Sequence, residues 1–111
     1  MTGKQYGFIV QALAEEARRY KGLGDSIYHK KLTVTLQAAI NTKQLDRLFD
    51  GFDEEQLHLI AEALEATANR RQTLGMTFDA VQMQEAAQLV REAKQRRESE
   101  WIARRFQEGI A

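Results

Sequence analysis

Apolar side chains recur at helical spacing through most of the chain, and glycines interrupt the pattern. In residues 4–21 the apolar positions fall on one stripe of a helix, namely Tyr6, Ile9, Val10, Leu13, Ala17 and Tyr20. The stretch KGLGDS follows, in which Gly22 or Gly24 can adopt the left-handed conformation that ends a helix. Asp25 or Ser26 can then cap the next helix. The pattern therefore predicts a first helix over residues 4–21.

Residues 26–41 fit two kinds of secondary structure. As a strand, Leu32, Val34 and Leu36 alternate with threonines. As a helix, one face carries Tyr28, Leu32, Leu36, Ala39 and Ile40. The rest of the chain supplies no second strand, and an isolated ribbon is barely stable in water. We therefore expect a helix here.

The clearest helix start lies in the stretch GFDEEQL. Asp53 can cap the helix, and Gln56 stands three residues later, as a capping box requires. Leu57, Ile60 and Leu64 then form an apolar stripe that ends before Gly75. A short helix is predicted over residues 43–50, and a long last helix from residue 77 or 79 to about residue 108. The sequence thus predicts an all-α fold, a compact bundle of about five helices.

The apolar stripes also predict which side chains form the core. The expected core consists of Ile9, Leu13, Tyr20, Leu32, Leu36, Ile40, Leu45, Leu48, Phe49, Leu57, Ile60, Leu64, Phe78, Leu89 and Val90.

The last helix changes its apolar face along its length. Its first half presents Phe78, Met83, Ala86, Leu89, Val90 and Ala93, and residues 94–100 contain no apolar side chain. Trp101, Ile102 and Phe106 then point about half a turn away from that first face. Because one straight helix cannot bury both faces in one core, it either bends near 94–100 or extends beyond the core. We therefore expect a helical core domain over 1–93 and a helical extension over 94–111, in the same domain or as an interface arm.

Composition and charge limit the kinds of site, the cellular location and the types of partner that we expect for this protein. The chain has no cysteine, which excludes disulfides and thiolate metal sites. The only early apolar run, FIV, is too short for a signal sequence or a membrane span, so we expect a cytoplasmic protein. Sixteen basic and sixteen acidic residues balance, but residues 1–48 carry a net charge of +4 and residues 49–79 a net charge of −5. The overall neutrality argues against non-specific binding of nucleic acid, and the polarity between segments allows head-to-tail or partner electrostatics.

Few side chains form a pattern that catalysis would need. Glu55-x-x-His58 has the spacing of a carboxylate-bridged metal site, but His29 does not supply the second copy that such a site requires. The stretch GLGDS lacks the lysine of a phosphate-binding loop. Neither Ser26 nor Ser99 stands in a nucleophile motif. We therefore expect a protein that is not an enzyme, with no metal site and no cofactor.

One part of the chain suggests DNA binding. The stretch VTLQAAINTKQLDRLFDG, followed by EEQLHLIAEALEA, resembles the phage-repressor type of helix-turn-helix over residues 32–66, although Ala39 stands where that family usually has glycine. The resemblance implies a transcriptional regulator whose Lys43, Gln44 and Arg47 face the major groove. Nucleic acid is therefore our second choice of partner.

The C-terminal segment suggests protein binding. Trp101, Ile102, Arg105 and Phe106 are of the types that carry binding energy at interfaces, because aromatic and arginine side chains bury a large area and keep a polar end. A long amphipathic helix suits docking in a groove or a symmetric homodimer. Glutamates among the arginines argue against a membrane-surface helix. Our leading hypothesis is a small regulatory or adaptor protein that binds another protein or a second copy of itself through these four residues.

Overall fold

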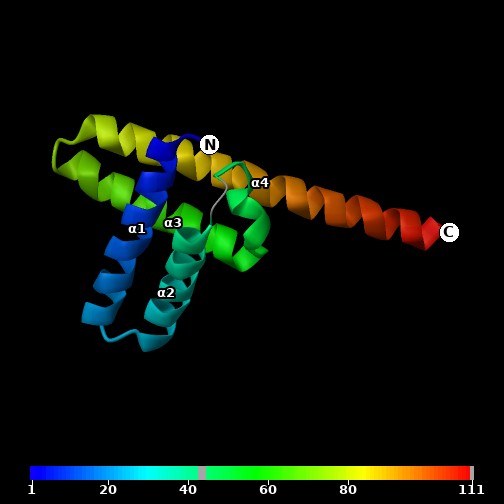
Figure 1. The fold of residues 1–111 in the computed structure, drawn as a ribbon, viewed down its shortest axis with the longest axis horizontal. Helices are drawn as coiled ribbons and strands as arrows, with labels where there is room; N and C mark the ends of the chain where they lie inside the picture. Colours follow the sequence, from blue (N-terminus) through cyan, green and yellow to red (C-terminus); the bar gives the residue numbers. More distant parts are fainter. Residues whose placement is uncertain (43–44, 111) are drawn as a thin grey trace.

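The computed structural model describes residues 1–42 and 45–110, and within them the fold is all-α (Figure 1). Its elements are α1 (Gly3–Gly22), α2 (Ser26–Asn41), the 3-10 helix η1 (Leu45–Gly51), α3 (Glu54–Thr73) and α4 (Thr77–Ile110). The described residues thus form four α-helices, and the predicted number of five was slightly too high. The short helix expected near 43–50 is the 3-10 helix η1. Residues 26–41 are helical, so the strand interpretation is wrong.

Local signals set the ends of these helices. The predicted capping box is present at α3, where the Asp53 carboxylate accepts from the Gln56 amide N–H and the Gln56 side chain accepts from the Asp53 N–H. Asp25 caps α2 by accepting from the Tyr28 N–H. The turns after α1 and α3 contain Gly24 and Gly75, at φ of 78° and 79°. Glycine suits both turns because a side chain would make this left-handed conformation costly.

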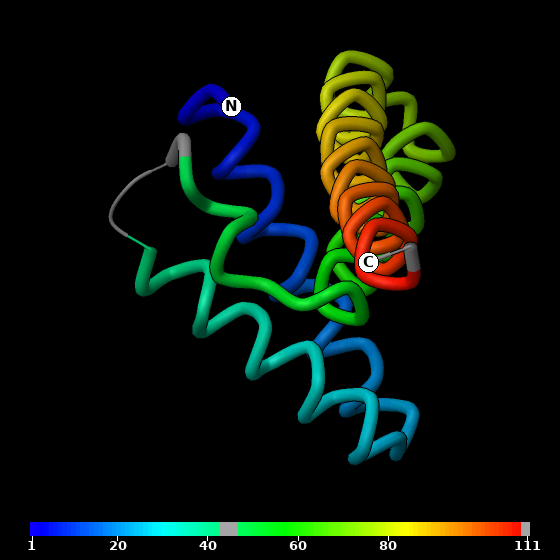
Figure 2. Tube along the Cα trace, turned by 90° about the vertical axis from the view of Figure 1, so that its right-hand side faces the viewer, coloured from blue at the N-terminus to red at the C-terminus, as the bar shows by residue number. Residues whose placement is uncertain are grey.

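The helices pair as two hairpins that cross each other. Figures 1 and 2 show α1 and α2 as one antiparallel pair, leaning against the pair formed by α3 and α4. Two polar contacts help to fix the first pair: the Tyr6 hydroxyl donates to the Ala39 carbonyl at 3.0 Å, and His29 Nδ1 lies 2.7 Å from the Ala17 carbonyl. The second pair forms the long axis of the molecule.

Side chains from α1, α2, η1, α3 and the first half of α4 form the core. Of the expected core, Ile9, Leu13, Leu32, Leu48, Leu57, Ile60, Leu64 and Val90 are buried. Tyr20, Leu36, Phe49 and Leu89 are partly buried, and the side chain of Leu45 lies outside the described part of the structure.

The expectation was wrong for two core residues, Ile40 and Phe78, which are 50% and 62% exposed. On α2, Leu32, Thr35 and Ala39 face inward, so Ile40 is turned about 100° away from the core. Phe78 lies in the first turn of α4, where its ring packs under the Lys4 ammonium at 4.2 Å instead of in the core. Helical spacing alone placed both residues within an apolar arc that is wider than the buried one.

Helix α4 does not fold back onto the bundle. It is continuous from Thr77 to Ile110, and Figure 1 shows its C-terminal part projecting from the body as a straight rod. The molecule is 55 Å long, and its radius of gyration of 15.4 Å exceeds the roughly 13 Å of a compact domain of this length. Of the two expected courses of the last helix, the structure has the one that extends beyond the core.

Candidate protein-binding site

The projecting part of α4 begins beside the first residue of α3. The two helices pack side by side in opposite directions, and α3 starts at Glu54. The last strong tie of α4 to the body is Arg97, whose guanidinium donates to the main-chain carbonyls of Phe52 and Phe49, the latter at 2.6 Å. Arg97 Nε also lies 4.0 Å from a Glu54 carboxylate oxygen. We call residues 98–110, which follow this tie, the C-terminal arm.

The C-terminal arm holds large apolar side chains in water. Trp101, Ile102 and Phe106 are 57%, 61% and 69% exposed. The Arg105 guanidinium lies over the Trp101 ring, 5.0 Å from its centroid. All four residues that the sequence suggested for partner binding thus lie together on one exposed helical segment.

Trp101 continues the buried stripe of α4 past the end of the body. From Met83 the stripe runs through residues 87, 90, 94 and 97 to Trp101, in alternating steps of four and three residues. Met83, Ala87 and Val90 are buried, whereas Lys94 and Arg97 are half-buried. Such spacing keeps the side chains on the side that faces a neighbouring helix. Trp101 therefore points to the side where α3 would lie if α3 were longer.

This geometry corrects the expected half-turn between the two apolar faces. The buried face of α4 is formed by Ala80, Met83, Ala86, Ala87 and Val90. Phe78, which lay at one edge of the expected face, is not part of the buried face. The centre of the buried face is therefore rotated about the helix axis to the side on which Trp101 lies. Ile102 and Phe106 lie about 100° and 140° further round the helix. The arm thus has one residue, Trp101, in line with the core stripe and two beside it.

A shallow recess lies at the base of the arm. It has a volume of about 340 Å³ and is lined by Glu54 from the start of α3 and by Glu98, Trp101 and Ile102 from α4. Glu98 also pairs with Lys94, one turn earlier, at 2.6 Å. The recess therefore combines an apolar wall from the arm with two carboxylates, one from each helix.

The residues suggested for DNA binding are only partly placed. Lys43 and Gln44 lie outside the described residues, and Arg47 is exposed on η1. The α3 helix that follows begins with Glu54 and Glu55, so the first turn of this helix carries negative charge. DNA binding through these three residues stays a prediction.

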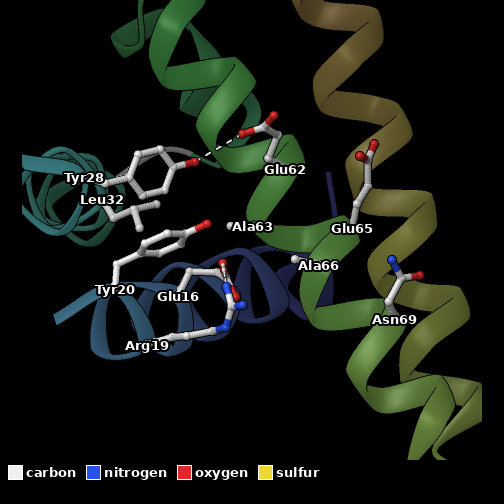
Figure 3. Close-up of a pocket in the computed structure, with 10 residues that line it drawn as sticks. All are labelled: Glu16, Arg19, Tyr20, Tyr28, Leu32, Glu62, Ala63, Glu65, Ala66 and Asn69. Atoms are coloured by element: carbon white, nitrogen blue, oxygen red, sulfur yellow. Dashed lines mark hydrogen bonds and ion pairs between the residues drawn. The ribbon is translucent and has the colours of Figure 1, made fainter. Parts of the chain in front are cut away.

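A polar pocket of about 350 Å³ opens between α1, α2 and α3 (Figure 3). The Tyr20 and Tyr28 rings lie side by side with centroids 4.3 Å apart, and the Tyr28 hydroxyl donates to Glu62 at 3.1 Å. Burial, and then the hydrogen bond to Glu62, raise the pKa of the Tyr28 hydroxyl above its ordinary value. Buried Glu16 pairs with Arg70 at 2.5 Å. Since these carboxylates already have partners within the chain, the pocket is best described as a polar joint between helices.

The two side chains of the suspected metal motif, Glu55 and His58, also have polar partners within the chain. His58 Nε2 lies 2.9 Å from Glu62, one turn along α3, and Glu55 accepts a hydrogen bond from Lys31 at 2.8 Å. That hydrogen bond raises the pKa of the Lys31 ammonium. Across residues 1–42 and 45–110, no three histidine, aspartate or glutamate side chains gather in a group that could hold a metal ion.

In that same part of the chain, every helix is too short or too polar to cross a membrane. No protein-family model, no curated protein and no solved structure matches the chain. The site must therefore be judged by its own geometry, and the strongest geometric feature is the C-terminal arm.

Proposed function

We propose that this chain is a small regulatory or adaptor protein of the cytoplasm that works without bond chemistry. It binds another protein, or a second copy of itself, through the C-terminal arm. The anchors are Trp101, Ile102, Arg105 and Phe106. The helical body holds the arm away from its own core, so that these side chains remain available to a partner.

The observation that carries the proposal is the unpaired length of α4. From their exposed fractions, Trp101, Ile102 and Phe106 leave on the order of 300–400 Å² of apolar surface in water. That is the size of the largest apolar patch on an ordinary soluble monomer, and such patches are often binding sites. At about 25 cal/mol per Å², covering even half of this surface contributes several kcal/mol.

The arrangement of charge supports binding to a protein. Arg105 packs over Trp101, and Glu98 and Arg97 flank the base of the arm. A partner helix that covered the apolar residues would meet a rim of both signs of charge, which gives orientation and specificity more than affinity. By occupying a partner's groove, or by linking two chains, the arm would act through occlusion or tethering.

The test compares which proteins are retained by three forms of the full-length chain. Ile102→Glu/Phe106→Glu places charge on the exposed apolar residues, and Gln107→Glu is a matched control on another side of the same helix. We expect the wild type and the control to retain the same proteins or a tagged second copy, and the double variant to lose them. An identical set on all three forms would refute the proposal.

A truncation after Arg97 tests whether the arm is dispensable for folding. Because the side chains of residues 98–109 are exposed, the shortened chain should keep the helical circular dichroism of residues 1–97 and a cooperative unfolding transition. An unfolded truncate would show that Trp101 and Phe106 stabilise their own bundle, contrary to the proposal.

A further inference from the structure

The two helical hairpins are built on the same plan, so each can be compared with the other. α1 and α3 both have 20 residues and both begin with a capping box, at Thr2 and at Asp53, which is 51 positions later. The alternation of buried and exposed side chains in residues 2–42 recurs at most positions of residues 53–93, with the same offset. The chain thus contains one hairpin twice.

The turns of the two hairpins have the same main-chain hydrogen bonds. The N–H groups of residues 23–25 donate to carbonyls in the last turn of α1, and those of residues 74–76 donate to the corresponding carbonyls of α3. Each turn also exposes a leucine and, in the next helix, a second large apolar side chain. These are Leu23 and Ile27 in the first hairpin, 65% and 72% exposed, and Leu74 and Phe78 in the second, 70% and 62% exposed.

The two turns differ in charge. Residues 18–31, which we call the basic tip, contain five basic residues and one acidic residue, a net charge of +4. The corresponding residues 69–82 contain two basic residues and one acidic residue, a net charge of +1. Because the second turn forms the same hydrogen bonds without this charge, the turn itself does not require the cations of the basic tip. The one acidic residue of the basic tip, Asp25, already caps α2.

Three cations of the basic tip are available to an anionic partner. Arg18, Lys21 and Lys30 are exposed, and none of the ion pairs within the described residues involves them. In contrast, Arg70 and Arg71 of the second turn pair with glutamates of α1. The free positive charge is therefore confined to one of two equivalent turns, which indicates a role in binding.

The shape of the basic tip favours a lipid bilayer over a protein or a nucleic acid. Figures 1 and 2 show this turn at the protruding end of the α1–α2 pair, away from α4. Leu23 lies in the turn and Ile27 in the first turn of α2, and the three free cations lie within about 8 Å of the turn along the hairpin, at 1.5 Å per residue. A protein would need a matching groove to cover such a convex apex. Nucleic acid would pair with the cations through its phosphates and leave both apolar side chains in water.

We propose that the basic tip docks on a membrane surface that carries anionic lipid. Leu23 and Ile27 enter the boundary between headgroups and acyl chains, which surface-bound apolar side chains reach at a depth of about 5–10 Å. Arg18, Lys21 and Lys30 lie at the level of the anionic headgroups and bind them by charge. The basic tip shares no residue with the C-terminal arm, so this inference goes beyond the proposed function and does not depend on it.

The first test measures cosedimentation of the full-length chain with vesicles. The vesicles contain phosphatidylcholine alone, or phosphatidylcholine and phosphatidylserine in equal parts. We expect the chain to bind the mixed vesicles far more strongly than the neutral ones, and less strongly as the salt concentration rises. Arg18→Gln/Lys21→Gln/Lys30→Gln should weaken binding to the mixed vesicles at least about tenfold.

A matched control removes the same charge from other parts of the surface. Arg47, Arg96 and Arg104 are exposed and, like the three cations of the basic tip, take part in none of the ion pairs within the described residues. The variant with glutamine at all three positions should bind the mixed vesicles like the wild type. An equal loss in both triple variants would show that binding follows net charge alone, and would overturn the inference.

The second test uses the equivalent turn as a control for the apolar contacts. Leu23→Ser/Ile27→Ser should weaken binding to the mixed vesicles about tenfold or more, because these side chains no longer enter the interface. Leu74→Ser/Phe78→Ser changes the counterparts in the second hairpin and should leave binding unchanged. All four side chains are exposed, so both variants should keep the helical circular dichroism of the wild type. Equal losses from the two turns would contradict the assignment to the basic tip.

The remaining outcomes identify the partner. A wild-type chain that does not bind the mixed vesicles would refute the inference. If such a chain is retained by polyglutamate or duplex DNA through Arg18, Lys21 and Lys30, the basic tip binds a soluble polyanion and the membrane is wrong as the partner. Retention of proteins through Ile102 and Phe106 is measured separately, so the proposed function can stand or fail whatever the vesicles show.

Discussion

Removing the Arg97 side chain should loosen the joint between the body and the C-terminal arm. Arg97 donates to the main-chain carbonyls of Phe49, which lies in η1, and of Phe52, which lies between η1 and α3. Only the Phe49 carbonyl has a second donor, the Phe52 N–H at 3.3 Å. In Arg97→Ala, the Phe52 carbonyl therefore loses its charged donor, and the Phe49 carbonyl keeps only its weaker one.

The magnitude follows from the type of bond and its exposure. A hydrogen bond from a charged donor is worth about 1.5–3 kcal/mol, so two such bonds set an upper limit of about 6 kcal/mol. The Arg97 side chain is 29% exposed, and water can reach this edge of the bundle and replace part of the loss. We therefore expect Arg97→Ala to lower the free energy of unfolding by about 2 kcal/mol. At about 2.1 cal/mol/K per residue, this lowers the melting temperature by roughly 8–9 °C.

Thermal and urea unfolding followed by circular dichroism measure this change. Arg96→Ala is the matched control, because Arg96 is an exposed arginine next in sequence, and it should change the free energy by less than about 0.5 kcal/mol. Arg97→Lys should fall between wild type and Arg97→Ala, since an ammonium lacks the fork that reaches two carbonyls together. If Arg97→Ala matched the control, the two main-chain bonds would not hold α4 to the body.

Three further changes test other parts of the structure by equilibrium unfolding. Met83→Ala should cost about 2–5 kcal/mol and Phe78→Ala less than about 1 kcal/mol, because only Met83 is buried; equal losses would refute this face of α4. Glu16→Ala should cost about 2 kcal/mol by removing a buried partner of Arg70, and a neutral result would mean that the pair contributes nothing. The hydrogen bond from Arg91 lowers the pKa of the Glu65 carboxyl in the folded chain. The pair therefore stabilises the fold above the ordinary pKa, by less than about 1 kcal/mol, and this contribution is lost as the pH falls through the lowered value. Glu65→Gln should thus destabilise near neutral pH and by a smaller amount as the pH is lowered through the titration of this carboxyl, and an effect that does not change with pH would contradict the assignment.

Features that depend on neighbours in sequence were predicted well. The capping box of Asp53 and Gln56 and the glycine turn before Met76 involve atoms a few residues apart, so their chemistry can be identified without knowledge of the fold. The helical interpretation of residues 26–41 was confirmed for a similar reason, since the alternative strand had no partner. The four residues suggested for partner binding do lie together in the structure, because i, i+1, i+4 and i+5 positions of one helix are neighbours.

Features that depend on which surfaces meet were predicted less well. A stripe of apolar residues gives the axis of a helix but leaves its rotation uncertain by a third of a turn, since several apolar residues can flank the true contact. For this reason Phe78 and Ile40 were predicted in the core although both are exposed. The 3-10 form of residues 45–51 had no distinct signal in the sequence, because its apolar residues fit either kind of helix.

By itself, the sequence determined an all-helical chain, the starts of its helices, and an apolar cluster beyond residue 100. Those properties follow from local hydrogen bonding and side-chain spacing. Only the tertiary structure decided that this cluster is uncovered. Helix α3 packs along α4 and begins at Glu54, so α4 loses its neighbouring helix after Arg97, and the stripe that buries Met83 reaches Trp101 with no helix packed against it in the described residues. The physical reason is a mismatch of length between two paired helices, and the residues that lie opposite each other can be known only once the pair has formed.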